Sequence, residues 1–131
     1  MRHASGSFKV SGMQEDPCEE LSGGAKLTRA SGDQAYAGDI DGNGKVQWLM
    51  SYRGDGTAHF VGIWHLTASI DGHDGSFVLE SVGEFDGKVS SGTLSIVDGL
   101  GAGDLESIRG SGSFRAAGGA DATYELDYEV S

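Results

Sequence analysis

Six Asp-Gly pairs set the rhythm of this sequence and restrict its fold more than any other feature. They begin at Asp41, Asp55, Asp71, Asp74, Asp86 and Asp98. With the close pair at 71 and 74 counted once, the successive steps are 14, 16, 15 and 12 residues. Asp-Gly supplies the positive φ angles that tight hairpin turns require. Since each step holds one strand and one turn, the pattern predicts an antiparallel meander.

Eight segments between these turns have the composition of β-strands. We expect strands near residues 6–12, 25–38, 45–52, 58–70, 75–85, 88–99, 110–116 and 122–130, and one short helical turn at 103–110. Closure of such a sheet removes its exposed edges, and short connections favour an up-and-down barrel over a Greek-key sandwich. We therefore predict an all-β, eight-stranded antiparallel up-and-down barrel that forms a single domain over residues 1–131.

The charge of the chain limits its partners. It carries 9 Lys plus Arg against 20 Asp plus Glu, a formal net charge of −11 over 131 residues. Such a field repels phosphate backbones and anionic lipids, so we expect neither nucleic-acid nor membrane binding. The start, MRHASGSFKV, lacks the apolar core of a signal peptide, and the single cysteine, Cys18, cannot form a disulfide within the chain. These features favour a cytoplasmic protein.

The stretch GDIDGNGKVQWLM, which begins at Gly38, resembles the start of a calcium-binding loop. Asp39, Asp41 and Asn43 occupy the first, third and fifth loop positions, but the twelfth, where a bidentate carboxylate is required, is Met50. The flanking residues show no helical periodicity. We therefore predict a tight β-turn here, and no metal site.

The pairing of the strands predicts which residues face the barrel interior. A loop centred on Asp55 places Leu49 opposite Val61, and a loop centred on His73 places His65 opposite Ser81. The interior face would then carry Leu49, Val61, Ile63, Phe77, Leu79, Phe85, Leu94 and Ile96. The outer face would carry an apolar patch on two strands, formed by Trp48, Met50, Tyr52, Phe60 and Trp64. Such a patch indicates an interface in a homodimer or higher homo-oligomer, or an alternative pocket.

A few polar residues on the predicted interior face are candidates for chemistry. They are Gln47, His65 and Ser81, with Tyr36 and Tyr124 as neighbours. A histidine in an apolar cavity can act as acid or base near neutral pH. The alternative is a core histidine whose hydrogen bonds are satisfied by Ser81 or by a backbone carbonyl.

Several segments, taken in order, resemble a bacterial family of unknown function whose fold is similar to the allene oxide cyclase barrel. They are SGSFKV, GGAKLTRAS, GDIDGNGKVQWLMSYRGDGTAHFVGI, DGHDGSFVLESVGEFDG, SGTLSIV and GSGSFRAAGG…YELDYE. Two departures stand out. Met13 and Gln14 occupy positions where relatives tend to have Trp and an acidic residue, and Trp64 replaces an acidic residue of the fourth strand.

The resemblance implies a cofactor-free isomerase or cyclase that acts on an apolar small molecule in the lumen, a chemistry that needs a dry, shaped cavity and few polar groups. His65 is the catalytic candidate, and the predicted substrate-binding residues are Gln47, Ser81, Tyr36, Leu49, Ile63, Phe77, Leu79 and Tyr124. Two alternatives are a non-catalytic barrel that binds a small molecule and an oligomeric assembly module.

Overall fold

The structure of the protein is a computed structural model that describes residues 1–117 and 122–130. The described chain is almost entirely β-structure. Its strands are β1 (Arg2–Glu20), β2 (Lys26–Gly38), β3 (Ile40–Tyr52), β4 (Ala58–Ile70), β5 (His73–Phe85), β6 (Val89–Ile96), β7 (Ala102–Gly103), β8 (Arg109–Ala117) and β9 (Ala122–Glu129). A single turn of 3-10 helix, η1 (Ser22–Gly24), joins β1 to β2.

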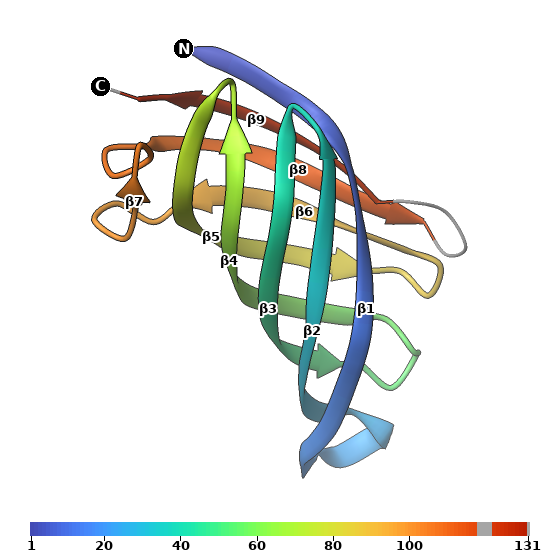
Figure 1. Ribbon diagram of the computed structural model, residues 1–131. Coiled ribbons are helices and arrows are strands. Elements are labelled where there is room, and N and C mark those ends of the chain that lie inside the picture. Colours follow the sequence, from blue (N-terminus) through green and yellow to red (C-terminus); the bar gives the residue numbers. More distant parts are fainter. Residues whose placement is uncertain (118–121, 131) are drawn as a thin grey trace.

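Eight of these strands form a closed antiparallel barrel, as Figure 1 shows. The hydrogen-bonded order is β4-β3-β2-β1-β9-β8-β6-β5, and a further pairing between β4 and β5 closes the ring. Neighbours in the barrel follow one another along the chain, so the predicted up-and-down topology is confirmed. The short strand β7 pairs with the start of β5 outside this order. No helix among the described residues is long and apolar enough to cross a membrane.

Side chains fill one end of the barrel. This end holds the turns between β2 and β3 and between β4 and β5, together with the segment between β6 and β8. In that segment Leu105 and Ile108 are buried against the barrel core, and the Ile108 amide donates to the Leu105 carbonyl at 3.2 Å. The short helical turn expected at 103–110 therefore covers the closed end.

The turn between β4 and β5 differs from the one expected. It consists of Asp71 and Gly72, whose φ angles are 52° and 80°, and Ile70 pairs with His73. Two positive φ angles in succession are characteristic of a two-residue hairpin loop, which Asp-Gly favours. The sequence predicted a loop centred on His73 instead. The resulting shift is an odd number of positions, so every side chain of β4 and β3 changes face relative to β5.

The segment with the calcium-loop spacing is part of strand β3, and the turn predicted around Asp41 and Asn43 is wrong. The chain reverses earlier, at Gly38 (φ 103°) and Asp39. The Asp39 amide donates to the Ser5 carbonyl at 3.0 Å, and the Asp39 carboxylate accepts from the Ser5 amide at 2.9 Å. Alternate side chains of an extended strand lie about 6.6 Å apart, so this segment does not wrap around an ion.

An extra residue in β1 decides which of its later side chains face inward. The register with β2 passes from Ser11–Asp33 to Gln14–Ser31, so β1 contains one residue more than β2 at this point. Such a bulge reverses the alternation of the strand beyond it. As a result Glu15, rather than Gln14, faces the inside of the barrel mouth.

Candidate functional site

The open end of the barrel contains a pocket of about 300 Å³. Most of the residues that line it are apolar or aromatic: Phe8, Val10, Met13, Glu15, Ala30, Trp48, Met50, Tyr52, Phe60, Phe85, Ser90, Phe114 and Ala116. Four of them, Trp48, Met50, Tyr52 and Phe60, belong to the set that the sequence suggested as an interface or an alternative pocket. They do not form an outer patch, because they face the lumen.

A carboxylate at the rim of this pocket is held by two hydroxyl groups. The Thr28 hydroxyl donates to Glu15 Oε2 at 2.6 Å, and the Tyr52 hydroxyl donates to the same oxygen at 2.8 Å. Burial, with the hydrogen bond to Glu15 as the next cause, raises the pKa of Tyr52 to about 12. Tyr52 is therefore a hydrogen-bond donor at neutral pH, and it fixes the orientation of the carboxylate.

Aromatic rings form the inner boundary of the pocket. The Trp64 side chain is only 1% exposed, and its ring centroid lies 5.3 Å from that of Phe8 and 5.0 Å from that of Phe114. Both pairs have the tilted, edge-to-face arrangement that aromatic rings prefer. Trp64, which the sequence placed in the outer patch, is therefore a core residue beneath the pocket.

Three buried polar atoms of the core have no hydrogen-bond partner among the described residues. They are Trp64 Nε1, Gln34 Nε2 and Ser81 Oγ. None of these residues lines the pocket, and Ser81 lies opposite Gly62, not opposite His65. Buried polar groups usually have a hydrogen-bond partner, often an ordered water. These three atoms are thus polar positions inside an otherwise apolar core.

Tyr36 and Tyr124 are neighbours inside the barrel, as the sequence suggested. Their ring centroids are 5.8 Å apart. The Tyr36 hydroxyl donates to the Gln34 side chain, and the Tyr124 hydroxyl accepts from the Ile40 amide at 2.7 Å. Burial raises the pKa of both tyrosines. They lie on the closed side of the pocket and are not among its lining residues.

Five residues predicted to face the lumen lie on the outer surface instead. They are Gln47, Leu49, Val61, Ile63 and His65, and all five are exposed. The two-residue turn at Asp71–Gly72 explains this error, because it pairs His65 with Val78. His65 is therefore not placed to act on a ligand in the lumen.

The other predicted interior residues face inward. Phe77, Leu79 and Ser81 are buried, and Phe85 lines the pocket. Leu94 and Ile96 are also buried on the interior face. Phe77 and Leu79 belong to the packed core and not to the pocket wall, so neither is in a position to contact a ligand there.

The outer face of the barrel carries a broad trough of about 930 Å³ that crosses β1 to β5. Among its lining residues are Arg29, Leu49, Val61, Ile63 and Glu80. Large apolar side chains are unusually exposed on this wall: Leu49 by 56%, Ile63 by 47%, and Val61 and Val82 by 39% each. The outer wall therefore carries an apolar patch, but none of these residues belongs to the outer patch that the sequence predicted.

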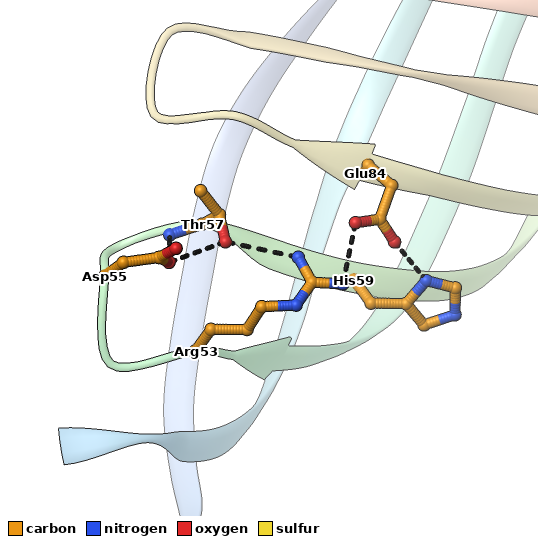
Figure 2. A network of polar contacts seen from close by, with 5 residues as sticks. All are labelled: Arg53, Asp55, Thr57, His59 and Glu84. Atoms are coloured by element: carbon orange, nitrogen blue, oxygen red, sulfur yellow. Dashed lines mark hydrogen bonds and ion pairs between the residues drawn. The ribbon is translucent and has the colours of Figure 1, made fainter. Parts of the chain in front are cut away.

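A polar network stabilises the hairpin between β3 and β4 on the outside, as Figure 2 shows. Arg53 binds Glu84 at 2.8 Å and the Thr57 hydroxyl at 3.2 Å, and His59 Nδ1 lies 2.5 Å from Glu84. The hydrogen bonds from His59 and Arg53 lower the pKa of Glu84. The Asp55 carboxylate accepts hydrogen bonds from the Thr57 hydroxyl at 2.7 Å and from the Thr57 amide at 2.9 Å. These two bonds lower the pKa of Asp55. All of these groups are solvent-accessible, and we interpret the network as one that stabilises the hairpin.

The described residues do not meet the requirements of a metal site, and the surroundings of the cysteine are simple. No three His, Cys, Asp or Glu side chains of residues 1–117 and 122–130 are grouped to hold a metal ion. Cys18 is exposed, and its thiol is 4.0 Å from the Asp16 carbonyl.

Three residues that give the pocket its character were not predicted from the sequence: Glu15, Phe8 and Phe114. Phe8 and Phe114 were available from the alternation of their strands. Glu15 was not, because the first strand was expected to end at residue 12 and the bulge that turns Glu15 inward leaves no clear signal in the sequence.

Comparisons with known proteins identify a family and a fold. The family model described as "Protein of unknown function (DUF3224)" matches residues 4–128. A solved structure of a protein of unknown function from the same family, from Shewanella oneidensis MR-1, is similar to this chain with a TM-score of 0.81 at 24% sequence identity. The similarity covers 100% of this chain and 98% of that one. No curated protein matches the sequence.

Proposed function

Because the chain belongs to the DUF3224 family of proteins of unknown function, we propose its role from the barrel itself: it binds an apolar small molecule in the pocket at the open end. The observation that supports this most directly is the composition of the pocket. Apolar and aromatic walls surround one fixed polar group, Glu15, held by Thr28 and Tyr52. Small-molecule sites have this character, with hydrophobic walls and a few placed polar groups.

The size of the pocket sets the size of the ligand. A volume of about 300 Å³ accommodates on the order of ten non-hydrogen atoms, if each takes the ~30 Å³ that a water molecule has in the liquid. Such a ligand is small compared with a lipid. A molecule with a short alkyl chain or a single substituted ring has this size.

Binding without catalysis is the form of this proposal that the geometry favours. The isomerase hypothesis relied on His65 as an acid or base in the lumen, and His65 lies on the outer surface. The ionisable groups that line the pocket are Glu15 and Tyr52, and the pKa of Tyr52 is raised to about 12. Tyr52 therefore does not exchange protons with a ligand near neutral pH.

Titration calorimetry with 1-octanol, a neutral probe of suitable size, tests the proposal. Ala116 is half-buried and lines the pocket, so Ala116→Trp should fill it and abolish binding. Ser113 is exposed on the same strand, so Ser113→Trp adds the same side chain outside and should leave binding unchanged. Unaltered octanol binding by Ala116→Trp would place the site elsewhere and refute the proposal.

A second role, self-association, is favoured by a row of exposed apolar side chains on the outer wall, formed by Leu49, Val61 and Val82. Leu49 pairs with Val61 and Val61 with Val82, while Arg29 lies at one end of this row. Glu80 lies next to Val82 on the same face of β5, at the other end. A two-fold axis through the middle of the row exchanges its ends and brings Arg29 of one copy to Glu80 of the other. This charge complementarity suits a second copy of the chain.

Light scattering tests self-association independently of the pocket. Ile63→Glu places a charge in the middle of the exposed apolar residues and should convert a dimer to monomer. Ser113→Glu, on the outer face of β8, is the matched control. A monomer in the unmutated protein at high concentration would end the idea of self-association without affecting the pocket.

A further inference from the structure

The pocket at the barrel mouth has a charge preference, and we infer that its ligand is an apolar organic cation, such as an alkylammonium. This inference rests on the proposed function and names the chemical class of the ligand. It follows from three features of the described residues: the position of Glu15, the aromatic walls, and the place of the neighbouring cations.

Glu15 lines the pocket, and its two hydroxyl donors engage one of its two carboxylate oxygens. Both of its hydroxyl donors, Thr28 and Tyr52, bind the same oxygen, Oε2. The other oxygen, Oε1, has no hydrogen bond or ion pair to another described residue. Among the residues that line the pocket, Glu15 is the one with a formal charge at neutral pH. A ligand head group that donates a hydrogen bond and carries a positive charge satisfies this oxygen, whereas a carboxylate would be repelled.

The walls favour the same ligand. Six aromatic side chains line the pocket: Phe8, Trp48, Tyr52, Phe60, Phe85 and Phe114. The faces of aromatic rings carry negative potential and attract ammonium groups, and rings around a cation are a common means of recognising alkylammonium ligands. The same rings bury the alkyl part of the ligand, so one set of residues recognises both ends.

No ion pair joins Glu15 to a neighbouring cation of the described chain, and none of these cations lines the pocket. Lys26 and Arg53 share a neighbouring hollow with Glu15 and Tyr52, and Lys26 Nζ lies over the ring of Tyr52, 5.1 Å from its centroid. Tyr52 thus already binds one ammonium group on a face of its ring. The net charge of −11 adds a long-range attraction for cations.

The test compares three probes with the same alkyl chain: octylammonium, 1-octanol and octanoate, each titrated by calorimetry at neutral pH and low salt. Octylammonium should bind severalfold more tightly than 1-octanol, the size of effect that a partly exposed ion pair provides. It should bind at least tenfold more tightly than octanoate. The preference should decrease as salt is added.

Two variants separate the contribution of Glu15 from that of the overall charge. Glu15→Gln can still accept the bonds from Thr28 and Tyr52, and it should bring octylammonium and 1-octanol to equal affinity. Asp16→Asn removes the same charge from the neighbouring residue, which does not line the pocket, and it should retain the preference.

Each outcome decides one claim. If the three probes bind equally to the unmutated protein, the cation inference is wrong and small-molecule binding stands. If Glu15→Gln keeps the full preference, the overall charge and not Glu15 causes it, and the inference is equally wrong. If none of the probes binds, the proposed function fails and the inference fails with it.

Discussion

Neighbouring residues of β4 test the orientation of the barrel faces most directly. Trp64 is 1% exposed inside the barrel, whereas Ile63 is 47% exposed outside. The hairpin that the sequence suggested would have reversed these positions. A Trp side chain buries up to about 250 Å², worth about 6 kcal/mol at ~25 cal/mol per Å² as an upper bound. Measured costs for replacing a core Trp with Ala are roughly 3–5 kcal/mol.

We therefore expect Trp64→Ala to lower the free energy of unfolding by about 3–5 kcal/mol, and Ile63→Ala by about 1 kcal/mol or less. The assay is urea unfolding followed by far-UV circular dichroism, which does not depend on the tryptophan signal. Trp64→Phe keeps an aromatic ring beside Phe8 and Phe114, and it provides a folded variant if Trp64→Ala does not fold. Equal costs at the two positions, or a greater cost at Ile63, would refute the assignment of faces.

Three further changes test other parts of the structure. Tyr124→Phe removes the acceptor of the buried Ile40 amide and should cost about 1–3 kcal/mol in thermal unfolding; an unchanged melting temperature would contradict this. Gly72→Val forces a β-branched residue to a φ of 80°, so it should cost about 1–2 kcal/mol, whereas valine at the exposed, extended Thr93 should cost almost nothing. The pKa of Tyr52 rises from its usual value of about 10 to about 12 on folding; stability should be fully present below pH 10 and decline as the pH rises toward 12, less steeply in Tyr52→Phe, as measured by urea unfolding across that range.

The fold was predictable because turn chemistry and alternation agree along most of the chain. The Asp-Gly pair at Asp55 predicted the register of β3 and β4, and Leu49 does pair with Val61. Leu94 and Ile96 face inward as expected, and they pair with Ser81 and Leu79.

The site was not predictable to the same degree, because its residues depend on two local choices that the sequence leaves open. The stretch DGHDG contains two Asp-Gly pairs, and the first one forms the turn. A second choice, the bulge in β1, selects Glu15 over Gln14 for the interior. Either choice taken differently changes which residues meet in the lumen without changing the fold.

The distribution of ionisable groups is the strongest physical reason to favour binding over proton-transfer chemistry. The buried residues of the described chain include Thr28, Gln34, Ser81 and three tyrosines, but no Asp, Glu, His, Lys or Arg. Burial raises the pKa of those tyrosines, which keeps them protonated at neutral pH. A general acid or base works best when its pKa is near the working pH. The lumen therefore offers hydrogen bonds and aromatic walls, and Glu15 is the charged group that we propose to hold a ligand at the mouth.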